Sequence, residues 1–502
     1  MIDTNRLMKM IIEVSIWIMI WILLIIFFGS VNPLFIFDMD DWTNIAQFRA
    51  ALPIWGAWNP IKVLPEILMP ATGKLSVWFI MPIVGSYFEA LSWGMSIVLS
   101  TVITVYIFLF SKFVSHWTDS FYVRMVLSVL FLLLHFIVFI NYDDGSGFTE
   151  HFFYQFNATC IFNYTIPWLV NEICVFSLII SKYKSFDKKA YKYSLYLLMY
   201  LSVFSNLYTS IVLVSYLLAE MMICVIVQKK EGHSFIKEFP HIIKSFGYSK
   251  MIFIMLWLLS LGFELSGGRA KGFEQGINIF RRIKDTITFF FIAMERVNGV
   301  VRVAVIIAIL SGVLISIISK KRDEENREYL QICVIIAMTL IFHVIYLIVL
   351  SSVVSPSYVG GTESIGAIYC WLFVLLFVSV LHVSKGRYTK SADLVFVLLI
   401  IVIGNKVIFG EQEYKNLSYN YRQSRLITED IIDQYVYADR NLIKNPEIHV
   451  PLYDGSGWPL SYDKIGNRVS YTLYQHDIVN TYISASFVGD KEKNNQFGVP
   501  VP

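Results

Sequence analysis

The chain has 502 residues, of which 56% are hydrophobic and 16% are charged, and its formal net charge is +3. A soluble protein carries about 25% charged residues, and here the deficit is concentrated in long apolar runs, which excludes a set of soluble domains. The same composition excludes nucleic-acid binding as the main function of the chain. The first apolar run, at 11–28, is long enough to span a bilayer and shows no signal-peptide cleavage site.

Hydropathy predicts a polytopic membrane protein. Several of the predicted segments are close to the roughly 20 residues that a 30 Å hydrocarbon core requires, whereas those near 193–206 and 251–265 are short. The expected fold class is an all-α bundle of about 11 transmembrane helices. The predicted spans are 10–36, 89–111, 123–141, 160–181, 193–206, 207–228, 251–265, 298–319, 330–351, 367–384 and 394–410.

Lysine and arginine predict the orientation of these spans. The loops near 112–124, 182–192, 229–250, 320–329 and 385–390 are basic, whereas those at 141–159 and 351–366 contain neither residue. The positive-inside rule therefore puts the N-terminus in the cytoplasm, and an odd number of spans puts the C-terminus outside.

Two domains are expected on this basis. The first is a transmembrane domain at 1–410, and the second is a small extracytoplasmic α+β domain at 411–502. The C-terminal domain opens with a helix-like stretch at 421–437 and continues with sequence typical of turns and short strands. The outer loops of the first domain are expected near 37–88, 141–159, 264–297 and 351–366.

The strongest chemical signal follows the first span. Asp38, Asp40 and Asp41 lie within four residues, and Trp42 follows them. Carboxylates at a membrane surface can act as a general base on a lipid-linked head group, or two of them can hold a divalent cation such as Mg²⁺ or Mn²⁺. The competing interpretation is that Asp40 or Asp41 caps a surface helix and that Trp42 is an interfacial residue instead of a sugar-stacking one.

Further along the same outer segment, Lys62 and Glu66 lie one helical turn apart. They form either an i,i+4 surface pair or a site at which Lys62 contacts a phosphate. The fourth outer loop, with Tyr358 beside two glycines, is either an ordinary turn or the lining of a cavity.

Two other outer loops carry charged candidates. Asp143 and Asp144 begin a Gly-rich acidic turn that either is simply solvated or binds a cation or sugar hydroxyls. His151 after it is expected to be polar surface. Arg269 is flanked by glycine and suits a phosphate. We expect a second basic group to lie on an amphipathic helix against anionic lipid: Arg281, Arg282 and Lys284.

The first span, the outer Asp40-Asp41-Trp42, the long proline-bearing outer loop, the further spans and the outer tail together resemble the GT-C fold glycosyltransferases. Among these the chain is similar to bacterial serotype-converting O-antigen glucosyltransferases. The resemblance is architectural over most of the chain and involves a motif only at 38–42 and, weakly, at Arg269.

The resemblance implies a bacterial inner-membrane enzyme of the cell envelope. It implies a sugar donor on undecaprenyl phosphate, expected to be glucose, and a surface polysaccharide such as the O-antigen of lipopolysaccharide as acceptor. Asp40 or Asp41 would act as the base in an inverting transfer, and Arg269 with Lys62 would neutralise the phosphate. A polysaccharide polymerase or a flippase for lipid-linked glycans is the alternative, although no inverted repeat of the kind transporters show is detected.

Overall fold

The computed structural model describes most of the chain. The described residues are 4–36, 39–139, 151–153, 157–183, 189–229, 235–267, 278–318, 324–384, 421–452 and 462–501. The predicted span at 394–410 therefore lies outside the described residues.

The chain is a predominantly helical, multi-pass membrane protein. Within the described residues, nine helical runs are long and apolar enough to cross a bilayer. Two further predicted spans are helical but shorter: α6 (Phe121–Ile137) and α9 (Lys189–Val203). The nine runs are Leu7–Val31, Val63–Val84, Tyr87–Val114, Ala158–Lys182, Leu207–Ile226, Tyr248–Ser266, Gly299–Ile318, Asn326–Val354 and Pro356–Ser384.

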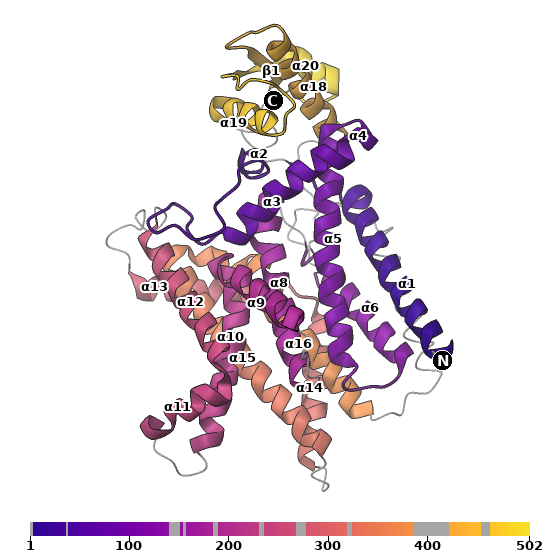
Figure 1. Ribbon diagram of the computed structural model, residues 1–502, viewed down its shortest axis with the longest axis vertical. Helices are drawn as coiled ribbons and strands as arrows, with labels where there is room; N and C mark the ends of the chain where they lie inside the picture. The colour runs from indigo at the N-terminus through magenta and orange to yellow at the C-terminus, as the bar shows by residue number, and fades with distance from the viewer. Residues whose placement is uncertain are drawn as a thin grey trace.

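All of these runs except Val63–Val84 coincide with predicted spans. This run consists of α3 (Val63–Leu75), a π-helical turn η2 (Ser76–Ile80) and α4 (Met81–Val84), and it lies inside the segment expected as an outer loop. Its prolines led to that expectation, but Pro65 lies in the first helical turn, where no backbone N–H is required. Figure 1 shows α3 running obliquely across the end of the bundle nearest the tail.

Local sequence explains where several helices begin. Ser86 caps α5 (Tyr87–Val114) by accepting a hydrogen bond from the backbone N–H of Glu89, and Ser120 caps α6 in the same way. Asn157 accepts from the N–H of Cys160 at the start of α7 (Ala158–Cys160). These short side chains satisfy N–H groups that have no partner within the helix.

The remaining elements of the bundle follow in chain order. Two π-helical turns, η1 and η3, lie in or beside the first and fourth spans. The bounds are α1 (Thr4–Ile26), η1 (Phe27–Val31), α2 (Met39–Asn44), η3 (Ile161–Thr165), α8 (Ile166–Tyr183), α10 (Leu207–Lys229), α11 (Phe235–Phe246), α12 (Tyr248–Ser266), α13 (Ile279–Glu295), α14 (Gly299–Ile318), α15 (Glu324–Val354), η5 (Pro356–Gly360) and α16 (Thr362–Ser384).

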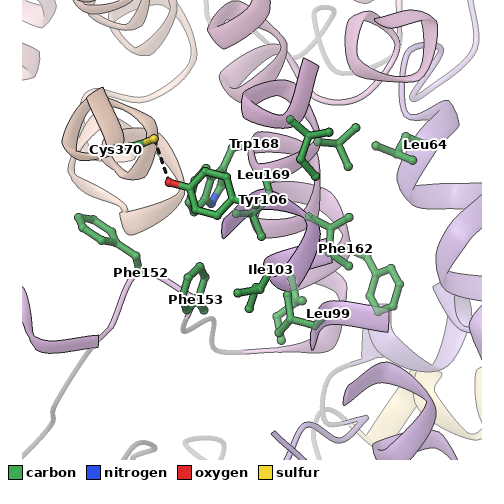
Figure 2. Close-up of a cluster of buried hydrophobic side chains, with 14 of the residues drawn as sticks. Leu64, Leu99, Ile103, Tyr106, Phe152, Phe153, Phe162, Trp168, Leu169 and Cys370 are labelled. Atoms are coloured by element: carbon green, nitrogen blue, oxygen red, sulfur yellow. Dashed lines mark hydrogen bonds between the residues drawn. The ribbon is translucent and has the colours of Figure 1, made fainter. Parts of the chain in front are cut away.

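An aromatic core joins α5, α8 and α16. The hydroxyl of Tyr106 donates to the Sγ of Cys370 at 2.9 Å, and Trp168 packs beside them (Figure 2). The loop residue Phe153 stacks parallel to Trp168, with ring centroids 6.3 Å apart. The ring of His151 packs beside that of Phe153 and is fully buried, so the expectation that His151 is polar surface is wrong.

The tail is a small α+β unit. It consists of α18 (Tyr421–Arg440), β1 (Glu447–Pro451), α19 (Tyr462–Gln475), β2 (Ser486–Asp490) and α20 (Lys491–Phe497). The two strands pair in parallel, with Glu447 opposite Ser486.

Helix α18 confirms the expected helix at the start of the tail, but α19 falls where turns and strands were expected. Its buried residues Ile465, Val469 and Leu473 recur every four positions, which is a helical period.

Figure 1 shows the tail at one end of the molecule, and the N-terminus and α11 near the other. The tail packs on the beginning of α5 through α18. There Arg425 pairs with Glu89 and, at 3.0 Å, with Glu429. Tyr421 packs against Phe35 and Phe88 at the same place. The tail is therefore fixed to the bundle by both polar and aromatic contacts.

Candidate functional site

Helix α2 carries the acidic motif of the first outer segment. It begins at Met39, directly after Asp38, which lies outside the described residues. Figure 1 shows α2 between the bundle and the tail, just below α19. We call this contact of α2 with α19 the seam. The acidic motif therefore contacts a helix that is distant in sequence, since Asp40 and Arg468 are 428 positions apart.

Asp40 presents an exposed carboxylate at the seam. Its side chain is 64% exposed, and its Oδ1 lies 3.2 Å from Nη1 of Arg468 on α19. The same nitrogen lies 3.2 Å from the carbonyl oxygen of Met39 and 3.2 Å from Oγ1 of Thr43. Such an exposed pair adds little stability, but three acceptors around one nitrogen restrain both side chains.

Asp41, its neighbour, is completely buried. Its Oδ1 accepts a hydrogen bond from the backbone N–H of Thr159 at 2.6 Å. Asn44 extends this contact, since its Nδ2 lies 3.5 Å from Oγ1 of Thr159. Thr159 belongs to the first turn of α7, where backbone N–H groups have no intrahelical partner and a negative charge is favoured. Asp41 therefore occupies the environment of a helix cap, and the helix that it caps is the fourth span.

Trp42 is only 1% exposed and does not face solvent. Its indole lies parallel to the ring of Tyr87 at the start of α5, with centroids 6.5 Å apart and planes 8° apart. The hydroxyl of Thr472 on α19 donates to the backbone oxygen of Trp42. In this structure Trp42 packs the tail onto the bundle.

His476 lies under the seam, directly after α19. Its Nδ1 lies 2.7 Å from the hydroxyl of Tyr87, and its Nε2 lies 3.2 Å from the carbonyl oxygen of Ile45. Since a carbonyl only accepts, Nε2 carries the proton and Nδ1 accepts from Tyr87. Burial lowers the pKa of His476 to about 4, with the nearby Lys74 adding to the effect. The ring is therefore neutral at pH 7.

A pocket of about 400 Å³ brings together two other predicted site residues, Lys62 and Tyr358. Its polar lining residues also include Tyr164, Asn206 and Glu264. Its apolar lining includes residues from α10, α12 and α15: Leu207, Leu261, Leu265, Leu350, Val353 and Val354. An amphipathic ligand fits such a mixed lining.

Neighbouring contacts fix Lys62 at the rim of this pocket. The backbone N–H groups of Val63 and Leu64 donate to the oxygen of Phe204, at 3.0 and 3.3 Å. Glu66, considered above as the partner of Lys62, forms an ion pair with Arg49. Tyr358 is half-exposed, and its ring meets that of Tyr208 edge to face, with centroids 6.2 Å apart.

One helical run connects the seam to the pocket. Thr159 contacts Asp41 in α7, and Tyr164 in the adjoining turn η3 lines the pocket. Five residues separate them, which corresponds to about 7.5 Å along a helix axis. The acidic motif and the Lys62 pocket therefore lie at the two ends of a short, buried helical segment.

Four predicted site residues cannot be placed in this arrangement. Asp38, Asp143, Asp144 and Arg269 lie outside the described residues. Among the residues that are described, no group of three or more His, Cys, Asp or Glu side chains could hold a metal ion.

Sequence reasoning missed the contribution of the tail. Arg468, Thr472 and His476 occupy positions i, i+4 and i+8 and all contact the segment around α2. That spacing is itself a signal of one helix face. The glycine and asparagine residues in the same stretch, however, favour turns and short strands.

Fold and site together define a polytopic helical membrane protein with a small α+β tail and a carboxylate at their seam. Comparison with protein-family models, with curated proteins and with solved structures gives no match to this chain.

Proposed function

We propose that this chain is a membrane glycosyltransferase that moves a sugar, with glucose the first candidate, from a polyprenyl-phosphate donor to a surface polysaccharide such as O-antigen. The observation that carries the proposal is the exposed carboxylate of Asp40 at the seam, in a chain whose neighbouring pocket contains Lys62. Transfer from a lipid-linked donor requires an acid–base group and a pocket that can hold the donor phosphate.

The pocket supports the choice of donor. The Lys62 ammonium suits a phosphate, and the hydroxyls of Tyr164 and Tyr358 can donate to phosphate or sugar oxygens. The apolar lining residues of α10, α12 and α15 suit the first isoprene units of the lipid. A soluble nucleotide sugar has no hydrocarbon chain to contact them.

Asp40 is assigned as the general base and Asp41 as its structural support. Asp40 takes the proton of the acceptor hydroxyl while the acceptor oxygen bonds to C1 of the sugar. The bond from C1 to the phosphate oxygen breaks in the same step, inverting C1 and releasing polyprenyl phosphate. Lys62 would stabilise the charge that develops on the phosphate. Arg468 keeps the Asp40 carboxylate oriented at the seam.

The decisive experiment compares Asp40→Asn with wild type in proteoliposomes that contain radiolabelled polyprenyl-phosphate glucose and a lipopolysaccharide acceptor. Loss of a general base lowers a rate by about 10²- to 10⁴-fold, so we expect transfer to fall by at least about 100-fold while donor binding persists. Asp433→Asn is the matched control, because Asp433 is an exposed carboxylate on α18 of the tail.

Equal transfer by Asp40→Asn and wild type would remove Asp40 as the base. If wild type moves label across the bilayer without attaching it to the glycan, the chain is a flippase and the proposal fails. If it joins lipid-linked repeat units to each other instead, it is a polymerase.

A further inference from the structure

The bundle holds a second and larger pocket, of about 580 Å³, toward the end that lies away from the tail. Its walls come from α5, α8, α10, α15 and α16. Lys182 and Ile226 lie near the ends of α8 and α10, and Arg327 lies in the first turn of α15, so the mouth is at the helix termini. None of its residues belongs to the site proposed for glycosyl transfer.

Among the described residues at the mouth of this pocket, the basic side chains of Lys182, Lys250 and Arg327 outnumber the carboxylates of Glu220 and Glu328. Lys182 and Lys250 share the single carboxylate of Glu220, at 3.0 and 2.6 Å. Glu328 is engaged by Nε2 of His116 at 2.6 Å. Arg327 is exposed and has no ion pair with any residue that the structure describes. An anion at the mouth would complete this arrangement.

Below the mouth the polarity changes along one face of α15. Gln331 lies one turn beyond Arg327, about 6 Å deeper at 1.5 Å per residue. Val334 and Ile335 lie one turn deeper still, and the wall then becomes apolar as far as Trp371 and Val374 of α16. From Arg327 to Ile336 the lining extends about 14 Å along the helix. From the mouth inward, the lining therefore offers a charged group, an amide and then hydrocarbon. A phospholipid presents its phosphate, ester and acyl chain in the same order.

We propose that this pocket binds an anionic glycerophospholipid from the leaflet opposite the tail. Arg327 takes the phosphate, with Lys182 beside it. The side-chain amide of Gln331 donates to an ester carbonyl, and one acyl chain lies against Val334, Ile335 and Val374. The site is independent of the transfer reaction, and an inactive Asp40→Asn chain retains it.

The test is native mass spectrometry of the full-length protein, titrated with phosphatidylglycerol or with phosphatidylcholine of the same acyl chains. We expect phosphatidylglycerol to bind about tenfold more tightly, and Arg327→Gln to remove that preference. Arg440→Gln is the matched control, because Arg440 is an exposed arginine at the end of α18 in the tail, away from the pocket, and should leave binding unchanged.

A variant that fills the pocket distinguishes lipid bound inside it from lipid attracted only by surface charge. Ile335→Trp should lower phosphatidylglycerol binding by about tenfold while Arg327 remains in place. Equal affinity for the two lipids, or no effect of either variant, overturns the proposal. Retention of polyprenyl phosphate in preference to phosphatidylglycerol also overturns it, by naming a different occupant.

Discussion

Asp40 and Asp41 are adjacent and chemically identical, yet their surroundings differ completely. The side chain of Asp40 is 64% exposed and faces Arg468, whereas Asp41 is buried against the first turn of α7. Asp40 therefore remains the residue proposed as the base, whereas Asp41 accepts a hydrogen bond at the start of α7 and not at a helix starting near Trp42. A change at each position should accordingly have a different kind of effect.

Asp41→Ala should destabilise the protein, whatever its effect on activity. It leaves the N–H of Thr159 without its acceptor in a buried place, which costs about 1–3 kcal/mol. Thermal unfolding in detergent measures the loss, with the exposed Asp433→Asn expected within about 0.5 kcal/mol of wild type. Wild-type stability of Asp41→Ala would show that the cap is dispensable.

His476 should make the stability of the seam depend on pH. Its folded-state pKa of about 4 lies below the ordinary value of 6.5, so the folded state binds fewer protons between these values. The stabilisation is complete above pH 6.5, decreases as the pH falls toward 4, and levels off below that. The total is about 3 kcal/mol at 1.36 kcal/mol per pKa unit.

Melting temperatures between pH 4.5 and 7.5 check this expectation. His476→Gln should flatten the profile, since glutamine does not titrate. His449→Gln, at a 45% exposed histidine elsewhere in the tail, should retain the slope that His476 creates. A profile unchanged by His476→Gln would assign the pH dependence to another group.

At this scale the sequence indicated where chemistry was concentrated but not which residue does what. Nothing local distinguishes Asp40 from Asp41, because the difference arises from α7 and α19, which are distant in sequence. Trp42 shows the same limit. An outer tryptophan beside carboxylates suggested an interface or a sugar platform, and burial against Tyr87 depends on packing that no local pattern contains.

Among the elements that the structure describes, the three π-helical turns lie in or beside the segments that lead to the candidate site. Turn η1 ends seven residues before α2 begins, η2 follows α3, and η3 contains Tyr164 of the pocket. Such turns insert one residue into a helix and are frequent at functional sites. Here they change the direction in which side chains project just where spans approach the seam.

Helix α3 passes very close to the segment after α2, and glycine permits the approach. A Cβ at Gly73 would lie well inside van der Waals contact with the backbone oxygen of Ile45, and close to the ring of His476. Backbone cannot move aside as a flexible side chain can. Gly73 therefore sets how closely α3 and the seam pack.

Gly73→Ala should destabilise the protein by about 1–3 kcal/mol, the usual cost of overpacking. Gly299→Ala is the matched control, because no atom lies within 4 Å of a Cβ at that position and alanine favours a helix. Thermal unfolding of the two variants separates the effects. Equal stability of Gly73→Ala and Gly299→Ala would mean that α3 can shift without cost.

The sequence predicted helices correctly where long apolar runs identify them. It failed where prolines interrupt a helix or where the helix is recognisable only from the spacing of its buried residues. Long apolar runs such as α5 and α15 could be predicted because burial in lipid allows little else. The run Val63–Val84 was missed because Pro65 and Pro70 suggested a loop, although α3 accommodates both. Helix α19 was missed because Gly466 and Asn467 suggested a turn.

At the scale of the whole molecule, the tail packs against the segment that carries the candidate site instead of standing apart from it. Arg468, Thr472 and His476 contact the segment that follows the first span, while Arg425 fixes α18 to α5. Hydropathy could predict that such a tail exists. Its docking could not be predicted, because each of these contacts joins residues hundreds of positions apart.

Arg468→Gln tests whether the tail positions the proposed base. Asp40 would lose its ion pair but remain a carboxylate, so we expect the transfer rate to fall by about tenfold with little change in KM for the lipid donor. Arg440→Gln, an exposed arginine at the end of α18, is the control. An unchanged rate in Arg468→Gln would limit this arginine to a structural role.

The same long separation has a consequence for biosynthesis. A ribosome adds about 5–20 residues per second, so the 428 positions between Asp40 and Arg468 take roughly 20–90 s to translate. Through that interval α2 has been synthesised but α19 has not. The seam closes only when translation is nearly complete, so a chain that stops early leaves Asp40 without Arg468 and the backbone oxygen of Trp42 without the hydroxyl of Thr472.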